Sequence, residues 1–197
     1  MAEPTLGLRE RKKVKTRLAI KAEAFQLFQK HGYEATTVEQ IAEATEISPS
    51  TFFRYFPTKE SVLIENQYPI EIVERFDQQP EKLGLVDAMH AAVTEIFAEL
   101  PSDELAALRK RNQLIMSTPD LRAAYMEHLF GLMTMIASKA ARRSNGSEDS
   151  LEIRTFAWVM QGVLTAASTQ WTENSDITII EAFDRAFAVI AEISVRK

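Results

Sequence analysis

The sequence contains no cysteine, which excludes disulfide bonds, thiolate zinc sites, iron–sulfur clusters and a cysteine nucleophile. This absence suits a reducing cytosol, and we expect a cytoplasmic protein. Glycine occurs six times and proline seven times in 197 residues, so few positions interrupt regular structure. Most stretches between them place apolar residues at helical rather than alternating spacing. The chain is therefore expected to be all-α.

Long apolar runs are missing as well. No segment reaches the roughly 18 uninterrupted apolar residues of a membrane span, and the first twenty residues are polar and basic. We therefore expect no membrane partner and no export signal. The histidines His31, His90 and His128 lie in no metal-ligand spacing, and no P-loop, nucleophile-elbow or dinucleotide motif is present. The sequence predicts no metal, no cofactor and no enzymatic activity.

The formal net charge of -5 is distributed unevenly along the chain. Residues 1–21 hold seven lysines and arginines against two glutamates, a local charge of +5 that leaves -10 for the remainder. A basic segment ahead of an acidic body can attract phosphates through counterion release. We interpret residues 1–12 as a flexible basic arm that assists nucleic-acid binding, with a solvated tail that binds nothing as the alternative.

The next fifty residues carry the signals of three helices. The apolar residues Leu18, Phe25 and Phe28 fall at helical spacing and predict a first helix over residues 13–31, which Gly32 ends.

Two shorter helices should follow this one. Thr36 and Thr37 each precede an acidic or amide residue by three positions, the pattern of a capping box. Ser48 as N-cap and Pro49 at the first helical position then predict a helix over residues 49–55. Two short helices joined by a tight turn, behind a longer helix, form the layout that places a recognition helix in the major groove of DNA.

Residues 16–63 resemble the N-terminal domain of the tetracycline-repressor (TetR) family of transcription regulators. The most specific matching residues are Gly32 with Thr36-Thr37-Val38, Ile41-Ala42, Ile47-Ser48, the run Thr51-Phe52-Phe53-Arg54-Tyr55-Phe56, and Lys59-Glu60. The resemblance implies a helix-turn-helix DNA-binding domain at residues 13–58 and a larger helical domain at residues 59–197 that binds an effector and dimerises. About nine helices are expected in all.

Carried over residue by residue, the resemblance also implies which side chains bind double-stranded DNA. Phosphate contacts position a protein on the duplex, whereas base contacts give specificity. Thr37, Ser48 and Lys59 are expected to make phosphate or positioning contacts, and Ser50, Thr51, Phe53, Arg54 and Tyr55 are expected to face the groove.

Two positions depart from the family's common pattern. Glu46 stands in the turn where glycine is usual, and because only glycine adopts a left-handed conformation freely, Glu46 either costs about 1 kcal/mol or the turn is built differently. Phe53 stands where tyrosine is usual, and the missing hydroxyl removes one hydrogen bond to the DNA backbone, worth about 1 kcal/mol net.

Beyond residue 58 the sequence predicts long helices. Pro69 lies inside the first of them and should kink or end it near Tyr68. A bend there either couples effector binding to the spacing of the recognition helices or is inert. The predicted helices span residues 59–76, 84–99, 103–116, 119–142, 149–172 and 176–195.

The last two of these helices carry apolar stripes that need a partner, either the chain's own core or a second copy. The resemblance favours a homodimer interface formed by Phe156, Val163, Ala167, Trp171, Phe183, Phe187 and Ile190. A further apolar set is adaptable in shape. Most of its members should be core residues, and a minority should line a pocket for a small hydrophobic effector: Phe97, Met116, Tyr125, Phe130, Met133, Trp158 and Met160.

Residues 109–143 also resemble a C-terminal subgroup associated with mycofactocin-type regulators, some of which recognise acyl-coenzyme A thioesters. This resemblance would place Arg109, Arg111 or Arg122 near an anionic group of the ligand, with surface ion pairs as the alternative. The resulting hypothesis is a dimeric repressor that a small hydrophobic or acyl-type effector releases from a palindromic operator. A helical protein-interaction module without specific DNA binding is the alternative.

Overall fold

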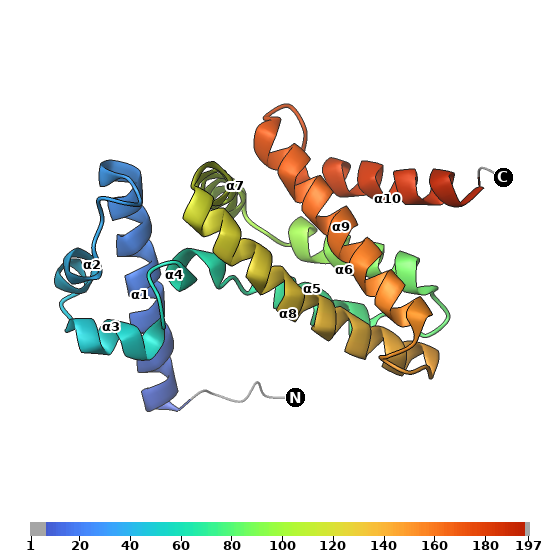
Figure 1. Ribbon diagram of the computed structural model, residues 1–197, viewed down its shortest axis with the longest axis horizontal. Helices are drawn as coiled ribbons and strands as arrows, with labels where there is room; N and C mark the ends of the chain where they lie inside the picture. Colours follow the sequence, from blue (N-terminus) through green and yellow to red (C-terminus); the bar gives the residue numbers. More distant parts are fainter. Residues whose placement is uncertain (1–6, 196–197) are drawn as a thin grey trace. The chain divides into compact units, whose positions relative to one another are not determined.

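In a computed structural model that describes residues 7–195, all regular structure is helical and the described residues form no strand (Figure 1). The all-α class is confirmed. The chain divides into a first unit that ends at Glu65 and a second that begins at Asn66. The first unit contains α1 (Leu8–His31), α2 (Val38–Ala44), α3 (Pro49–Tyr55) and α4 (Ser61–Ile64). The second contains α5 (Tyr68–Gln78), α6 (Leu85–Ala98), α7 (Ser102–Ser117), α8 (Pro119–Ser144), α9 (Leu151–Glu173) and α10 (Ile179–Val195).

The first helix begins earlier than the sequence suggested. It starts at Leu8 rather than near Lys13, because residues 8–12 are good helix formers and Glu10 lies in the first turn, where a carboxylate favours the helix dipole. Within the predicted flexible arm, residues 8–12 are therefore helical. Residues 1–6 of the arm lie outside the described range. At the other end the prediction is confirmed: Gly32 has φ +84°, and its N–H donates to the Phe28 carbonyl at 3.0 Å.

The core of the first unit joins α1, α2 and α3. Ile20 and Phe28 of α1, Ile41 of α2, and Phe52 and Phe56 at α3 are all at most 1% exposed. Full burial of each such side chain is worth about 1.5–3 kcal/mol. Three helices too short or too polar to persist alone are thereby held in one arrangement.

The turn between α2 and α3 is a Schellman motif with a glutamate in its left-handed position. Glu46 has φ +54°, in the region that favours glycine. Its N–H donates to the Glu43 carbonyl at 3.0 Å, and the Ile47 N–H donates to the Ala42 carbonyl at 2.9 Å. These two bonds define the motif. The turn therefore keeps the geometry that glycine normally provides, and Glu46 carries a strain of about 1 kcal/mol.

The long helix predicted over residues 59–76 is two helices. The four-residue α4 ends at Ile64, and α5 begins at Tyr68, so that Pro69 lies in the first turn, where its missing N–H costs nothing. A break does lie next to Pro69, but Pro69 starts α5 instead of kinking or ending a helix near Tyr68, and the preceding helix already ends at Ile64. Thr58 does not open an α-helix directly but caps a turn, because its Oγ1 accepts from the Ser61 N–H at 3.2 Å.

The second unit is built around a single apolar core. α9 packs against α8 and α10, α6 packs against α5 and α10, and α7 contacts α8 and α9 (Figure 1). Among its central side chains, Met89, Ile136 and Met160 are at most 1% exposed. Within the described residues, every helix is too short or too polar to cross a membrane.

Most residues predicted for a dimer interface lie inside this core instead. Phe183 stacks on Phe97 with ring centroids 5.3 Å apart, and Phe156 stacks on Phe76 at 6.0 Å. Trp171 is only 3% exposed. The apolar stripes of α9 and α10 are therefore covered within the chain, because periodicity identifies an apolar helix face but not the element that covers it. Phe156, Trp171, Phe183 and Phe187 are core residues, whereas Val163, Ala167 and Ile190 also border a surface groove.

The strained turn gives the first prediction. We expect Glu46→Gly to raise the free energy of unfolding by about 1 kcal/mol, because glycine relieves the left-handed strain. Urea unfolding followed by circular dichroism measures this change. Glu46→Gln is the control, since it removes the charge and keeps the strain. An equal gain in both variants would show that charge, not backbone conformation, limits stability here.

Candidate functional site

Helix α3, which the sequence predicts as the recognition helix, begins at a well-formed cap. Ser48 Oγ accepts from the Thr51 N–H at 3.1 Å and donates to Thr51 Oγ1 at 3.0 Å, while Pro49 occupies the first turn. A serine N-cap is worth about 1 kcal/mol, a large share for a helix of seven residues. The predicted helix start is confirmed. The hydroxyls of Ser48 and Thr51 form hydrogen bonds of this cap, in addition to the DNA contacts that the sequence predicts for these residues.

Two adjacent phenylalanines of α3 have opposite environments. Phe52 is fully buried, whereas Phe53 is 51% exposed and meets Phe52 edge-on with ring centroids 5.5 Å apart. Ser50 and Arg54 are also exposed, and Tyr55 is half-buried. An exposed ring between polar side chains matches a surface that meets a thymine methyl group or a sugar. Of the predicted groove-facing residues, the structure therefore exposes Ser50, Phe53 and Arg54 on one short helix and leaves Thr51 and Tyr55 half-buried.

The other end of α3 is held by α1 through a residue that the sequence analysis missed. Arg17 donates to the Tyr55 carbonyl at 2.8 Å, and its guanidinium lies 4.4 Å from the centroid of the Phe56 ring. The same side chain forms an ion pair with Glu65, whose carbonyl accepts from Lys21. In the sequence, the only indication of these contacts is the spacing of Arg17 and Lys21, two cations four positions apart on the first helix.

Two predicted phosphate-contact residues also serve the fold. Thr37 caps α2, accepting from the Gln40 N–H at 3.3 Å, while the Gln40 side chain accepts from the Thr37 N–H at 2.9 Å. This capping box confirms the predicted helix start. Lys59 donates to the carbonyls of Tyr33 and Thr36, each at 3.0 Å. The ammonium of Lys59 is thus engaged within the protein, which favours a positioning role over a direct phosphate contact.

A carboxylate beside Lys59 strengthens the same junction. Glu60 accepts a hydrogen bond from the Tyr33 hydroxyl. Partial burial alone would raise the pKa of Glu60, but hydrogen bonds from Tyr33, its own backbone and Thr58 outweigh burial and hold the pKa below its usual value. Glu60 is therefore ionised near neutral pH and ties the loop after α3 to the end of α1.

The start of α1 adds positive charge to this unit. Arg9, Arg11, Lys12, Lys13 and Lys15 are all exposed, and of these only Lys13 has an ion-pair partner among the described residues, Glu10 at 3.7 Å. A row of exposed cations beside a capped recognition helix is the electrostatic pattern of a surface that binds nucleic acid.

The seven predicted ligand residues lie in three separate places. Phe97 and Met160 belong to the core, and Met116 and Tyr125 line a small cavity between α7, α8 and α9. The remaining three, Phe130, Met133 and Trp158, line a cleft of about 250 Å³ between α8 and α9.

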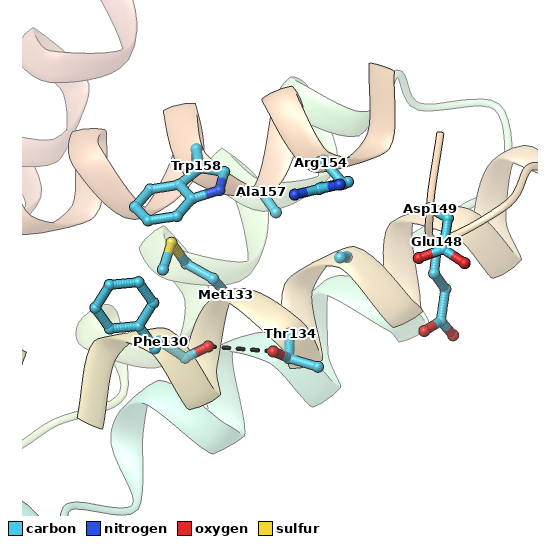
Figure 2. Close-up of a pocket in the computed structure, with 9 residues that line it drawn as sticks. Phe130, Met133, Thr134, Glu148, Asp149, Arg154, Ala157 and Trp158 are labelled. Atoms are coloured by element: carbon cyan, nitrogen blue, oxygen red, sulfur yellow. Dashed lines mark hydrogen bonds between the residues drawn. The ribbon is translucent and has the colours of Figure 1, made fainter. Parts of the chain in front are cut away.

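This cleft has an aromatic end and a charged end. Figure 2 shows the Phe130 and Trp158 rings on opposite sides of the cleft with Met133 between them, and Arg154, Glu148 and Asp149 beyond. The two rings meet edge-to-face with centroids 5.5 Å apart, and both are more than half exposed. An exposed aromatic pair that borders a cleft is a candidate surface for a ligand or partner.

A second apolar surface lies between α9 and α10. It forms a shallow groove, lined among others by Val159, Gly162, Ala166, Gln170, Arg185 and Val189. Val159 and Val189 are 37% and 51% exposed. A Cβ atom placed on Gly162 would meet no atom within 4 Å, so this subunit's own packing does not require a glycine there.

The arginines proposed to face a ligand have different environments. Arg109 donates to the Ile177 carbonyl at 3.1 Å and lies over the Trp171 ring, and Arg122 donates to the Met116 carbonyl at 3.3 Å. Both bond main-chain oxygens, and among the described residues neither forms the surface ion pair that was the alternative. Arg111 is half-buried beside Tyr125 and His128.

Comparison with known proteins gives matches over most of the chain. Residues 20–65 match the family model described as bacterial regulatory proteins of the tetR family, and residues 83–194 match the model of the MftR C-terminal domain. The chain is 31% identical over 169 residues to a putative mycofactocin biosynthesis transcriptional regulator of Mycobacterium tuberculosis, covering 85% of each chain. It is 34% identical over 194 residues to the transcriptional regulator TcmR of Streptomyces glaucescens, covering 92% of this chain and 83% of that one.

Solved structures show the same fold at lower identity. The repressor NalD of Pseudomonas aeruginosa superposes with a TM-score of 0.62 at 17% identity, covering 91% of this chain and 96% of that one. FadR of Thermus thermophilus, solved with lauroyl-CoA, superposes with a TM-score of 0.57 at 19% identity, covering 92% and 96%.

The two adjacent phenylalanines give a matched prediction. Phe52→Ala should lower the free energy of unfolding by about 3–5 kcal/mol, because it empties the core under α3. Phe53→Ala should change it by less than about 1 kcal/mol and instead weaken DNA binding by about tenfold. Urea unfolding and fluorescence anisotropy with labelled duplex measure the two effects. Equal losses of stability in both variants would contradict the assignment of Phe53 to the reading face.

Proposed function

Since the chain belongs to the TetR family of bacterial regulatory proteins and is a DNA-binding transcriptional regulator, we propose that it is a homodimeric repressor released from its operator by a small hydrophobic or acyl-type effector. Thr37, Ser48, Ser50, Thr51, Phe53, Arg54, Tyr55 and Lys59 form the proposed DNA-binding set, with Arg17 as the residue that positions α3.

The observation that carries this proposal is the outer face of α3. The helix is capped by Ser48, anchored beneath by Phe52 and held at its end by Arg17, so the side chains opposite the core are fixed in position. A preformed face of this kind binds DNA without first having to be ordered. Arg54, whose guanidinium lies 5.6 Å from the Tyr55 ring, is the residue best suited to contact a guanine edge or a phosphate.

A second copy of the chain is the proposed occupant of the groove between α9 and α10. Glycine in the middle of a helix costs about 0.5–1 kcal/mol relative to alanine, and nothing within the subunit repays that cost at Gly162. Together with Ala166, Gly162 leaves a shallow face onto which another helix can pack closely. Two-fold symmetry would place the recognition helices about 34 Å apart and imply a palindromic operator.

The class of effector is supported by relatives and by the pockets of the second unit. A relative from Bacillus subtilis, 23% identical over 77% of this chain, is named a fatty acid metabolism regulator protein. The Thermus FadR structure was solved with lauroyl-CoA. In this chain the cleft with Phe130 and Trp158 offers apolar walls and an arginine at one end. Such a cleft fits an amphipathic ligand better than a purely polar one.

The proposal is tested by titrating the protein against fluorescent duplex from its own upstream intergenic region at 50 and 200 mM salt, with a scrambled duplex of equal length. We expect specific binding that weakens on the order of 10³-fold or more between the two salts, as for proteins that contact several phosphates. Equal and weak binding to both duplexes would contradict the proposed function and favour a protein-interaction module.

The proposed dimer gives a further prediction. Gly162→Arg should produce a monomer at micromolar concentration, because a Cβ atom at this position meets no atom within 4 Å while the long charged side chain occupies the groove that the second copy would fill. Sedimentation velocity measures the change. Gly162→Ala should gain up to about 1 kcal/mol of helix stability within the subunit and weaken the dimer less than Gly162→Arg does. Glu127→Arg on the exposed face of α8 is the charge control. A dimeric Gly162→Arg protein would exclude this groove as the interface.

A further inference from the structure

Glu65, the last residue of the first unit, is bonded through three of its groups within that unit. Its N–H donates to the Ser61 carbonyl at 3.0 Å, its carbonyl accepts from the Lys21 ammonium, and its carboxylate forms an ion pair with Arg17. The side chains of residues 62–64, directly before it, are buried. The backbone of Glu65 is therefore fixed on both sides, and this gives its carboxylate a defined place against α1.

The Arg17 guanidinium joins this carboxylate to the end of α3. Its Nη1 atom donates to the Tyr55 carbonyl at 2.8 Å, and its Nη2 atom pairs with the Glu65 carboxylate. The guanidinium also lies 4.4 Å from the centroid of the Phe56 ring. Because the guanidinium is a rigid plane, fixing one nitrogen restricts where the other can point. The Glu65 carboxylate thus helps to set the direction in which Arg17 donates to α3.

The bond to Tyr55 matters because of its place in α3. Tyr55 is the last residue of the helix, and the last carbonyls of a helix find no donor inside it. Arg17 supplies a donor from another helix, and its positive charge also matches the negative end of the helix dipole. The end of α3 therefore depends on Arg17, whose own orientation depends on Glu65.

Two other roles for Glu65 predict different behaviour. The Arg17 and Glu65 side chains are 37% and 33% exposed, and an ion pair with this much exposure usually adds little to the free energy of unfolding. If Glu65 acted on DNA only through its charge, it would weaken binding, because a carboxylate repels phosphates. Removing the charge would then tighten binding. The sign of the change in DNA affinity therefore separates a positioning role from an electrostatic one.

We propose that Glu65 is a positioning residue for DNA binding, which holds Arg17 against the Tyr55 carbonyl and thereby orders the last turn of α3. The inference rests on the proposed DNA-binding set, of which Phe53, Arg54 and Tyr55 lie in that turn. Without the carboxylate, the Arg17 side chain regains rotamers that do not reach the carbonyl, and the last turn frays. In a helix of seven residues, one frayed turn is half of the reading face.

A double-mutant cycle on the full-length protein tests this role. The variants are Glu65→Gln, Arg17→Met and the two combined. Glu34→Gln is the matched control, since Glu34 is exposed and its carboxylate forms no ion pair among the described residues. Each protein is titrated at about 50 mM salt against fluorescent duplex from the upstream intergenic region and against a scrambled duplex of equal length.

We expect Glu65→Gln to weaken specific binding by about fivefold, although it removes a negative charge, and Arg17→Met to weaken it by about tenfold. In the Arg17→Met background, Glu65→Gln should leave the affinity unchanged or tighten it, because Glu65 acts through Arg17. Glu34→Gln should not weaken binding. If Arg17→Met does not fold, Arg17→Lys takes its place, since an ammonium lacks the planar fork that reaches both partners.

Amide hydrogen exchange of the free protein adds a structural readout. The Phe56 N–H donates to the Phe52 carbonyl at 2.9 Å and reports on the end of α3. Glu65→Gln should raise its exchange rate by about fivefold and leave the amides of α2 as in the parent. If the ion pair instead supported the whole unit, exchange would rise in α2 as well, because α1, α2 and α3 share one core.

Unchanged or tighter specific binding by Glu65→Gln would overturn the positioning role. So would an equal loss in the parent and Arg17→Met backgrounds, or exchange that rises equally in α2 and α3. Equal binding of the parent to both duplexes rejects the proposed function and this role with it. Specific binding by the parent with no loss in Glu65→Gln rejects the role alone.

Discussion

The proposed DNA-binding surface depends on one constraint: α3 has seven residues, too few for a helix to persist by itself in water. Its conformation must therefore come from its surroundings. Ser48 satisfies its first amides, Phe52 ties its inner side to the core, and Arg17 bonds its last carbonyl. Because each anchor acts on a different part of the helix, the outer side chains inherit a fixed orientation. Recognition in this unit is thus a property of the core rather than of α3 alone.

The parts of the fold that sequence patterns predicted well are those governed by local chemistry. The capping box at Thr37, the serine–proline start at Ser48 and the glycine stop at Gly32 each act within one turn, so short-range patterns were sufficient. The residues of α3 were predicted together for the same reason. Arg17 escaped prediction because its partner lies 38 positions away, and no local pattern encodes that distance.

Long-range packing explains the remaining differences. Phe156 and Phe183 were expected at a subunit interface, but helical periodicity is identical whether a stripe faces the chain's own core or a second copy. Once these faces are covered internally, the opposite sides of α9 and α10 become the free surface. The predicted ligand residues separated into core, cavity and cleft for a similar reason, since a pocket is formed by residues of more than one helix and no single stripe defines it.

The early start of α1 bears on the thermodynamics of association. Ordering one residue of a flexible arm costs about 1–2 kcal/mol of backbone entropy, and the segment from Leu8 onward is already helical. The Cα atoms of its cations also stand at the fixed rise of about 1.5 Å per residue, so only their flexible side chains can adjust to follow an anionic surface. The helix therefore exchanges adaptability for a smaller entropic penalty wherever this row of cations meets an anionic surface.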